Sequence, residues 1–156
     1  MTKTDLLNKR RERILRYAPL FLWIGVIFYL SSTQGSMSNT SRFIRPLLEW
    51  IFPLAPEETL QIYHGYIRKF AHFAEYAVLG FFASRTFWSS SAKFLQRFWY
   101  VFSLAFVLLI ASIDETNQSF NAARTGSIYD VLIDTSGGLT MILLFPIIKL
   151  FVKKKN

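Results

Sequence analysis

A short apolar stretch of the sequence carries side chains that could bind anions and transfer protons. Residues 68–80 read RKFAHFAEYAVLG, and Arg68, His72 and Glu75 follow one another in it at intervals of four and three residues. At about 100° per residue, a helix would place these three side chains on one face. A guanidinium group binds phosphate or carboxylate, and an imidazole beside a carboxylate can give or take a proton. This face is a candidate anion-binding and acid–base site.

Two later segments carry further acidic side chains at helical spacing. Asp114 and Gln118 lie four residues apart in DETNQ, with Glu115 beside them, and Asp130 and Asp134 repeat the interval. Asp134 and Glu75 fall more than one turn inside apolar segments, where a charge costs about 3 kcal/mol unless it is paired or hydrated. We therefore expect the three groups of polar residues to converge in one cavity.

The elements that would position these residues are membrane helices. Of the 156 residues, 52% are hydrophobic and 17% are aromatic, which is more apolar surface than a soluble chain of this length can bury. The apolar residues form runs long enough to cross a hydrocarbon layer of about 30 Å, at roughly residues 14–31, 68–88, 97–113 and 128–152. The sequence predicts an all-α fold: a polytopic membrane bundle of four transmembrane helices in a single domain, residues 1–156. Pro146 is expected to bend the end of the last helix.

The basic residues predict the orientation of the bundle. Thirteen of the 18 Lys and Arg residues lie on one side of it: in the N-terminal segment, in the 85–97 connection and from Lys149 onward. Because cytoplasmic loops are rich in Lys and Arg, we expect a multi-pass protein of the cell membrane with both termini cytoplasmic, residues 1–13 forming a basic cytoplasmic tail. The net charge of +8 is thereby explained by topology and by contact with anionic lipids, and nucleic acid is not an expected partner.

The long outer connection, residues 32–67, is predicted to have three parts. Its first part is rich in Ser, Thr, Asn and Gly and is expected to be a flexible loop. Residues 42–52, RFIRPLLEWIF, place Phe43, Leu47, Trp50 and Ile51 near one helical face, which is typical either of an interfacial helix or of an ordinary helix packed on the spans. Pro56, Glu57 and Glu58 then indicate a helix start that continues through Gly65 into the second span.

Some of the polar residues also have purely structural interpretations. Arg68 and Lys69 could be anchors that reach to the membrane surface. Ser127 followed three residues later by Asp130 matches a capping box, so Asp130 could serve to start the last helix. The whole group could also be a polar network that only fixes the register of the helices.

The two polar motifs together resemble the VanZ-like family of small bacterial membrane proteins. The resemblance covers about residues 20–145 and rests on Arg68, Lys69, His72, Tyr76, Leu79 and Gly80, followed by Asp114, Glu115, Gln118, Arg124 and Asp130 and a helix with Gly137 and Gly138. The family is named after an accessory protein of teicoplanin-type glycopeptide resistance. Asp134 departs from the pattern, because the family more often has Asn there.

The resemblance implies a cell-envelope protein connected with glycopeptide resistance, and it implies no particular reaction. From the predicted topology and the polar residues we expect a site that opens to the outer leaflet and acts on, or only binds, a lipid, a lipid-linked precursor or a glycopeptide. We expect the catalytic residues to be His72, Glu75, Asp114, Glu115 and Asp130. The expected substrate-binding residues are Arg68, Lys69, Tyr76, Gln118, Arg124 and Asp134. The sequence assigns neither the reaction nor the oligomeric state.

The charges of this predicted site do not balance. Three cations, Arg68, Lys69 and Arg124, face five carboxylates. The surplus implies protonated or hydrated carboxylates, or a divalent cation held by some of His72, Glu75, Asp114, Asp130 and Asp134, with Mg, Ca or Mn favoured over zinc by oxygen ligands. No residue spacing matches a standard metal motif, and no cofactor is assigned. The absence of Cys excludes thiol catalysis.

Overall fold

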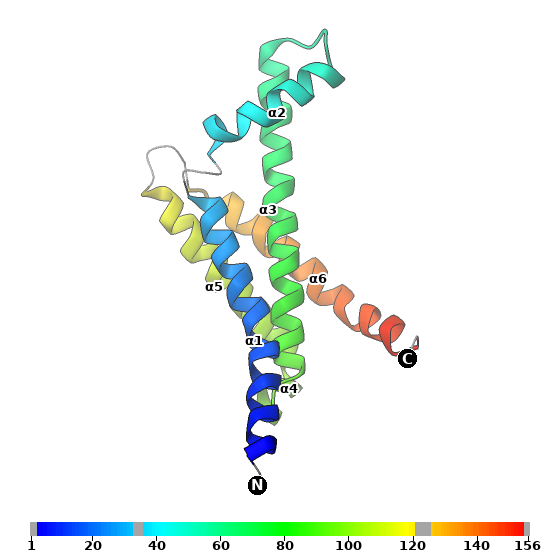
Figure 1. Cartoon of the computed structure of the whole chain (residues 1–156). Coiled ribbons are helices and arrows are strands. Elements are labelled where there is room, and N and C mark those ends of the chain that lie inside the picture. The colour runs from blue at the N-terminus through cyan, green and yellow to red at the C-terminus, as the bar shows by residue number, and fades with distance from the viewer. Residues whose placement is uncertain (1–2, 33–35, 121–125, 155–156) are drawn as a thin grey trace.

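The structure of the chain, a computed structural model, describes residues 3–32, 36–120 and 126–154, and within these ranges it consists of helices joined by short turns (Figure 1). The predicted all-α class is confirmed, with no strand in the described ranges. The helices are α1 (Lys3–Ser31), α2 (Met37–Ile51), α3 (Glu57–Trp88), α4 (Lys93–Arg97), α5 (Trp99–Ser119) and α6 (Ile128–Lys154).

The longest helix, α3, is the centre of the bundle. It packs against each of the other five helices and runs nearly the whole height of the molecule in Figure 1. α1 and α5 lie along its lower part, α6 crosses it, and α2 crosses it near its upper end. The predicted helix start at Pro56–Glu58 and its continuation through Gly65 are confirmed, because α3 begins at Glu57. The polar residues of the 68–80 stretch are therefore carried by the helix with the most neighbours.

Glycines allow α3, α5 and α6 to approach one another closely. A Cβ atom on Gly80 would lie 2.5 Å from the carbonyl oxygen of Gly138, and one on Gly137 would collide with the backbone carbonyl of Phe73. A Cβ on Gly138 would lie 2.5 Å from Val107 on α5. Small residues have this role in membrane bundles, where close backbone packing replaces the hydrophobic effect. The Gly137–Gly138 pair thus packs within the chain and brings Asp134, one turn earlier, against α3.

Within the described ranges, three helices are long and apolar enough to cross a membrane: Arg10–Ser31, Trp99–Ser119 and Ile128–Phe151. Their outer faces expose large apolar side chains such as Leu22, Leu143 and Leu150, which a soluble protein would bury. α3 has 32 residues, about 48 Å at 1.5 Å per residue, but its charged residues keep it outside this group. Its role as a fourth span stays a prediction.

Several predicted helix boundaries were wrong. α5 continues to Ser119, beyond the predicted end at residue 113, so Asp114, Glu115 and Gln118 lie within the helix and their side chains project into the bundle. α1 begins at Lys3, which makes the basic N-terminal segment helical. The prediction for α6 is borne out more closely, because the helix continues through Pro146 to Lys154, two residues past the predicted end. In each case the polar residues extend a helix whose apolar part is packed in the bundle.

The predicted flexible loop in the outer connection is partly wrong, because α2 begins at Met37. The carbonyl oxygen of Ser36 accepts hydrogen bonds from the backbone N–H of Thr40 (2.9 Å) and from the Thr40 hydroxyl (3.0 Å), which start this helix among residues expected to be a loop. The predicted helix at residues 42–52 is confirmed. Residues 33–35 of the expected loop lie outside the described residues.

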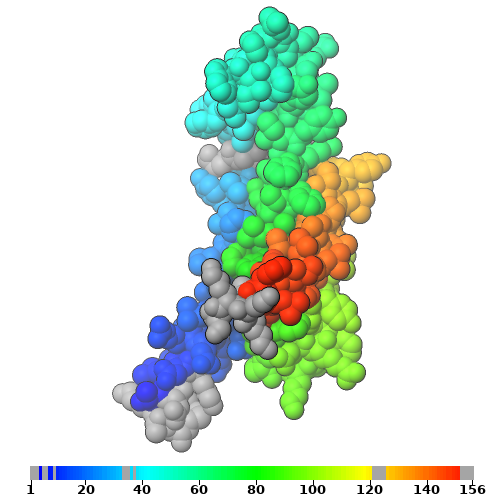
Figure 2. Space-filling model, turned by 90° about the vertical axis from the view of Figure 1, so that its right-hand side faces the viewer, coloured from blue at the N-terminus to red at the C-terminus, as the bar shows by residue number. Residues whose placement is uncertain are grey.

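α2 and the N-terminal part of α3 project beyond the other helices, as the space-filling view shows (Figure 2). We call this projection the outer arm, residues 37–65. Leu48 of α2 is buried against α3, while the face with Phe43, Leu47, Trp50 and Ile51 is exposed. The predicted apolar face of α2 is therefore present, and its position at a membrane surface stays a prediction.

Candidate functional site

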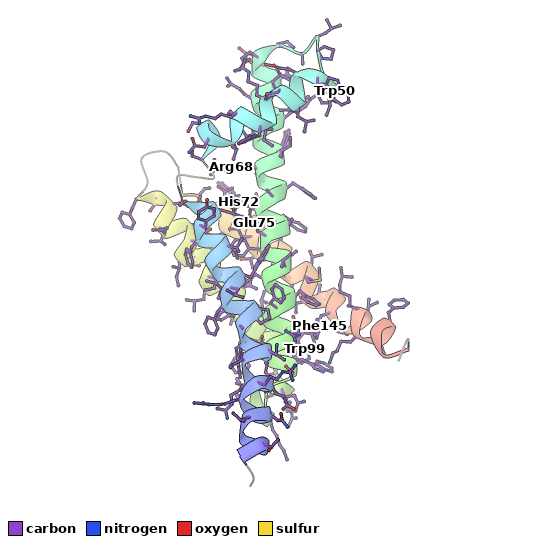
Figure 3. The ribbon with its side chains drawn as sticks, viewed as in Figure 1. Trp50, Arg68, His72, Glu75, Trp99 and Phe145 are labelled. Carbon is purple, nitrogen blue, oxygen red and sulfur yellow. The ribbon has the colours of Figure 1, made fainter. Side chains whose placement is uncertain are left out.

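A buried contact between a histidine and an aspartate joins α3 and α6. His72 Nδ1 lies 3.3 Å from Asp134 Oδ1, and the two side chains are 11% and 0% exposed. Figure 3 shows His72 and Glu75 on α3, near the point where α6 crosses behind it. The close approach of Gly137 to Phe73 explains why the two helices can bring these side chains together.

A second buried carboxylate, Asp114 of α5, is held by hydrogen bonds to one of its two oxygens. Oδ2 accepts from the hydroxyl of Ser31 on α1 (2.7 Å), from Gln118 Nε2 (3.0 Å) and from the Tyr76 hydroxyl on α3 (3.3 Å). The expected pairing of Asp114 with Gln118 at four-residue spacing is confirmed. Because the donors come from three helices, Asp114 ties α1, α3 and α5 together.

Glu115, the neighbour of Asp114, connects α5 to the start of α6. Its Oε2 accepts a hydrogen bond from the backbone N–H of Ser127 (2.9 Å), and the Ser127 hydroxyl accepts one from the backbone N–H of Tyr129 (3.2 Å). Ser127 therefore caps α6 as predicted. Glu115 rather than Asp130 accepts from the Ser127 N–H, because Gly126 lets the chain pass close to the backbone of α5.

These contacts bring four side chains together: His72, Asp114, Glu115 and Asp134, which we call the inner cluster. Each offers one nitrogen or oxygen atom, and the four atoms lie within 4.8 Å of one another. Asp114 and Asp134 are 0% exposed and Glu115 is 5% exposed. Among the described residues, Asp114 Oδ1, Glu115 Oε1 and Asp134 Oδ2 have no hydrogen-bond partner.

Such an arrangement of buried carboxylates lowers the stability of the folded protein unless something balances their charge. Two like charges 4.8 Å apart repel by about 3.5 kcal/mol at an effective dielectric constant of about 20. In the described part of the chain, the contact with His72 is the only ion pair of the cluster. Retaining three buried carboxylates with free oxygens is typical of a functional site.

A small pocket leads from the outer arm to the inner cluster. It has a volume of about 140 Å³ and lies between α1, α2 and α3. His72 forms part of its wall together with Arg68, Glu75 and His64, and apolar side chains such as Ile44 and Ile67 complete the lining. His72 is thus shared between the pocket and the cluster. Because Nδ1 faces Asp134, Nε2 is the ring nitrogen on the opposite edge.

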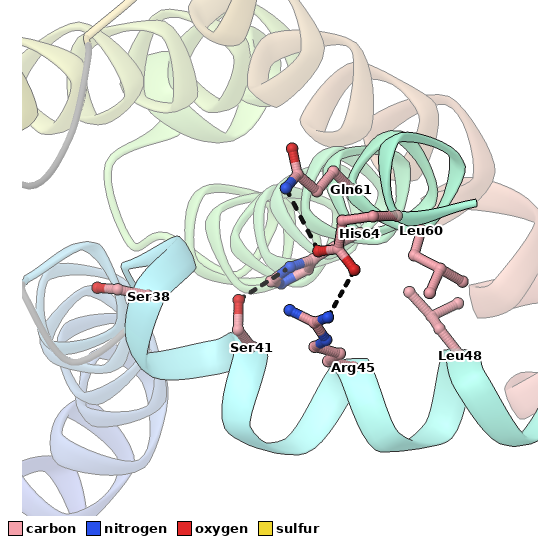
Figure 4. Close-up of a pocket in the computed structure, with 8 residues that line it drawn as sticks. Ser38, Ser41, Arg45, Leu48, Leu60, Gln61 and His64 are labelled. Atoms are coloured by element: carbon pink, nitrogen blue, oxygen red, sulfur yellow. Dashed lines mark hydrogen bonds and ion pairs between the residues drawn. The ribbon is translucent and has the colours of Figure 1, made fainter. Parts of the chain in front are cut away.

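A larger pocket of about 330 Å³ lies within the outer arm, between α2 and α3 (Figure 4). Its lining includes the exposed charged residues Arg45 and Glu57 and the buried His64. His64 Nε2 lies 3.1 Å from the hydroxyl of Thr40, and Nδ1 lies 3.4 Å from that of Ser41. Burial, and secondarily the positive charge of Arg68, lowers the pKa of His64 below its usual value.

The structure brings together most of the residues predicted for the site. His72, Tyr76, Asp114, Glu115, Gln118 and Asp134 form one connected group, and Arg68 and Glu75 line the adjoining pocket. Lys69 is exposed and lines neither of the two pockets. The predicted set of metal ligands is wrong in part: the group that could hold an ion has Glu115 in place of Glu75 and Asp130. Arg124 lies outside the described residues.

Two residues near the site were missed by the sequence analysis. Ser31 binds the anchored oxygen of Asp114, and His64 lines both pockets. A serine at the end of an apolar helix gives little signal. His64 lies four residues before Arg68 and eight before His72, so the same helical spacing that identified His72 could have found it.

Comparison with known proteins identifies the family. The family described as VanZ/LLP1 matches residues 17–149, a range that includes every residue of the inner cluster and of the two pockets. Neither a curated protein nor a solved structure gives a significant match. The predicted resemblance is confirmed over most of the chain. The chain belongs to the VanZ/LLP1 family.

Proposed function

We propose that this protein acts on the polar headgroup of a lipid-linked cell-envelope molecule at a site open to the outer leaflet. The observation that carries the proposal is the pocket of about 140 Å³ whose wall joins Arg68 to His72, beside the buried carboxylates. A guanidinium recognises phosphate, and a histidine oriented by a carboxylate exchanges protons or donates a hydrogen bond.

The proposal includes a topology of four spans with both termini cytoplasmic. The distribution of Lys and Arg supports it, and so does the position of the N- and C-terminal ends, which lie away from the outer arm in Figure 1. The central position of α3 supports its role as a span, because charged side chains are tolerated in membrane helices that face the interior of a bundle. A cysteine replacing Ser38 should react with an impermeant thiol reagent on intact cells, and one replacing Ser91 should not; the opposite labelling would invert the proposed topology.

In this proposal the parts of the site have separate roles. Arg68 binds the anionic group, His72 Nε2 faces the bound headgroup, and Asp134 holds the ring through Nδ1. Glu75 lines the same pocket and accepts hydrogen bonds from a hydroxyl-bearing group such as a sugar. Resistance to teicoplanin-type glycopeptides would follow as a phenotype if the changed molecule were the target of the antibiotic.

One observation favours a second candidate, binding without chemistry. The inner cluster places three carboxylates beside the pocket, and an anionic substrate would be repelled by them. A headgroup or glycopeptide rich in hydroxyl and amine groups would instead be attracted. In that case the protein would act as an accessory that sequesters an envelope component.

One experiment distinguishes the two candidate functions. Purified protein in detergent micelles is incubated with a lipid extract from a bacterial envelope, and the products are analysed by mass spectrometry. The proposal expects a lipid species that is converted by the wild type and by Leu79→Met, a volume-conserving change in the core, but not by His72→Gln. If wild type and His72→Gln leave all lipids unchanged while the same headgroup copurifies with both, binding without chemistry is the correct function.

A further inference from the structure

The hydrogen bonds around the inner cluster engage only one oxygen of each of the two carboxylates on α5. Asp114 uses Oδ2 and Glu115 uses Oε2 for bonds to residues outside the cluster, and their other oxygens are free. In metal sites the ligands are oriented in this way, by hydrogen bonds from an outer shell to the part of the ligand that does not touch the ion. Asp134 is completely buried with Oδ2 free, beside His72 Nδ1.

The unbalanced charge of the inner cluster is a second observation that favours a metal ion. Three carboxylates are buried there, and no Lys or Arg among the described residues forms an ion pair with them. As a metal ligand His72 is a neutral imidazole and balances none of these charges. A bound divalent cation would balance two of the three and satisfy the free oxygens at the same time.

We propose that His72, Asp114, Glu115 and Asp134 bind one divalent cation, of which Mn²⁺ is the best fit. Ligand atoms lie about 2.0 to 2.6 Å from such ions, so any two ligands of one ion are at most about 4 to 5 Å apart. The four atoms of the cluster lie within 4.8 Å of one another and meet this limit.

The ligand types narrow the choice of ion. Mg²⁺ demands near-ideal octahedral geometry and usually keeps several waters, so a dedicated cage of four protein ligands does not suit it. Ca²⁺ prefers oxygen ligands alone, and zinc sites rarely combine three carboxylates with a single imidazole. Carboxylates with one imidazole suit Mn²⁺, which accepts both ligand types. The pocket lined by Arg68, His72 and Glu75 provides the path of entry from the outer side.

A bound cation would make the role of His72 in the proposed function more specific. This consequence rests on the proposed function, whereas the metal site itself does not. With Nδ1 on the ion, His72 would carry its proton on Nε2 and donate a hydrogen bond to the headgroup. The positive charge would also reduce the repulsion between the three carboxylates and a phosphate, because two of the three negative charges would be balanced. Binding of the cation can be measured without any lipid, so the proposed function and the metal site can fail independently.

The test is a titration with Mn²⁺ of purified protein that has been stripped of metal with EDTA and desalted. The electron paramagnetic resonance signal of free Mn²⁺ measures the concentration of unbound ion. We expect saturable binding of one ion per chain, competed by Ca²⁺ and Zn²⁺. Asp134→Asn and Glu115→Gln should each weaken binding at least about 10-fold, the loss typical even of an outer-shell partner. The matched control Glu58→Gln, an exposed carboxylate of α3, should bind like the wild type.

Thermal unfolding of the same samples gives a second readout. Mn²⁺ should raise the unfolding temperature of the wild type and of Glu58→Gln. In EDTA, Asp134→Asn should be more stable than the wild type, because it removes one of the crowded buried charges, and Mn²⁺ should not raise its stability further. If Asp134→Asn does not fold, Glu115→Gln replaces it in this comparison.

Two results would overturn the metal site. One is a wild-type chain that binds none of Mn²⁺, Ca²⁺ and Zn²⁺ in a saturable manner. The other is an Asp134→Asn variant that folds and retains wild-type affinity for Mn²⁺. If the wild type binds no cation and Arg124→Gln acquires Mn²⁺ binding, then the charge of Arg124, and not a metal ion, balances the cluster.

Discussion

The outer arm and the inner cluster use the same kinds of charged residue in opposite ways. In the outer arm, Arg45 contacts Glu49 (2.8 Å) and Glu57, and all three side chains are about half exposed. In the inner cluster, three carboxylates are buried together, and a histidine is their only ion-pair partner among the described residues. Exposed pairs of opposite charge contribute little to stability and need no further explanation. Buried like charges oppose folding, so their retention points to a ligand or a reaction.

The largest difference between the two regions is expected in how well they tolerate the replacement of a glycine by leucine. Gly137→Leu should prevent the folded bundle from forming, because a Cβ there already collides with the backbone of Phe73. Gly65→Leu, in the outer arm, should be tolerated, since nothing lies within 4 Å of its Cβ position. Size-exclusion chromatography of the two variants in detergent measures this directly. Equal yields of monodisperse protein would mean that α3 and α6 do not pack as described.

A smaller effect is expected from removing single carboxylates. Asp114→Ala leaves the buried hydroxyls of Ser31 and Tyr76 without their acceptor and removes one hydrogen bond of Gln118, and each unpaired buried group costs about 1–3 kcal/mol. The matched change Glu49→Ala, which removes an exposed partner of Arg45, should leave the unfolding midpoint unchanged. Both are compared by chemical unfolding in mixed micelles. Loss of stability in Glu49→Ala equal to that in Asp114→Ala would remove the distinction between the regions.

The smallest effect concerns pH and is confined to the outer arm. The pKa of His64 is lowered by burial and by Arg68, so its neutral form stabilises the contact between α2 and α3. This stabilisation is present above the pKa of an unfolded histidine, about 6.5, and is lost as the pH falls through the lower pKa of the folded state. Hydrogen exchange of α2, corrected for its intrinsic pH dependence, should therefore accelerate below pH 6 relative to α5.

His64→Gln is the control for this pH effect. The other charged groups around His64 are Arg45, Glu57, Arg68 and Glu75, which line the same pockets. If one of them were responsible, the acceleration of exchange in α2 would persist in His64→Gln. The assignment to His64 requires that it disappear.

Helical spacing made the inner cluster predictable in outline and not in detail. The four-residue interval of Asp114 and Gln118 predicted a contact that the structure has. Whether Glu115 or Asp130 joins the cluster depends on the rotation of α5 and α6 about their axes, which is set by backbone contacts at Gly126 and Gly137. The start of α2 was missed because Ser and Thr residues favour loops and helix caps equally, and the choice is made by packing on α3.

The account depends above all on His72 and Asp134 forming one buried unit, and a double-mutant cycle tests this most directly. The unfolding free energies of the wild type, His72→Gln, Asp134→Asn and the double variant are measured in the presence of EDTA. With the two atoms 3.3 Å apart, we expect a coupling energy of about 0.5–3 kcal/mol, against additive effects for His64→Gln combined with Asp134→Asn. Additivity of His72→Gln and Asp134→Asn would mean that α3 and α6 do not bring these residues together, and it would contradict the inner cluster.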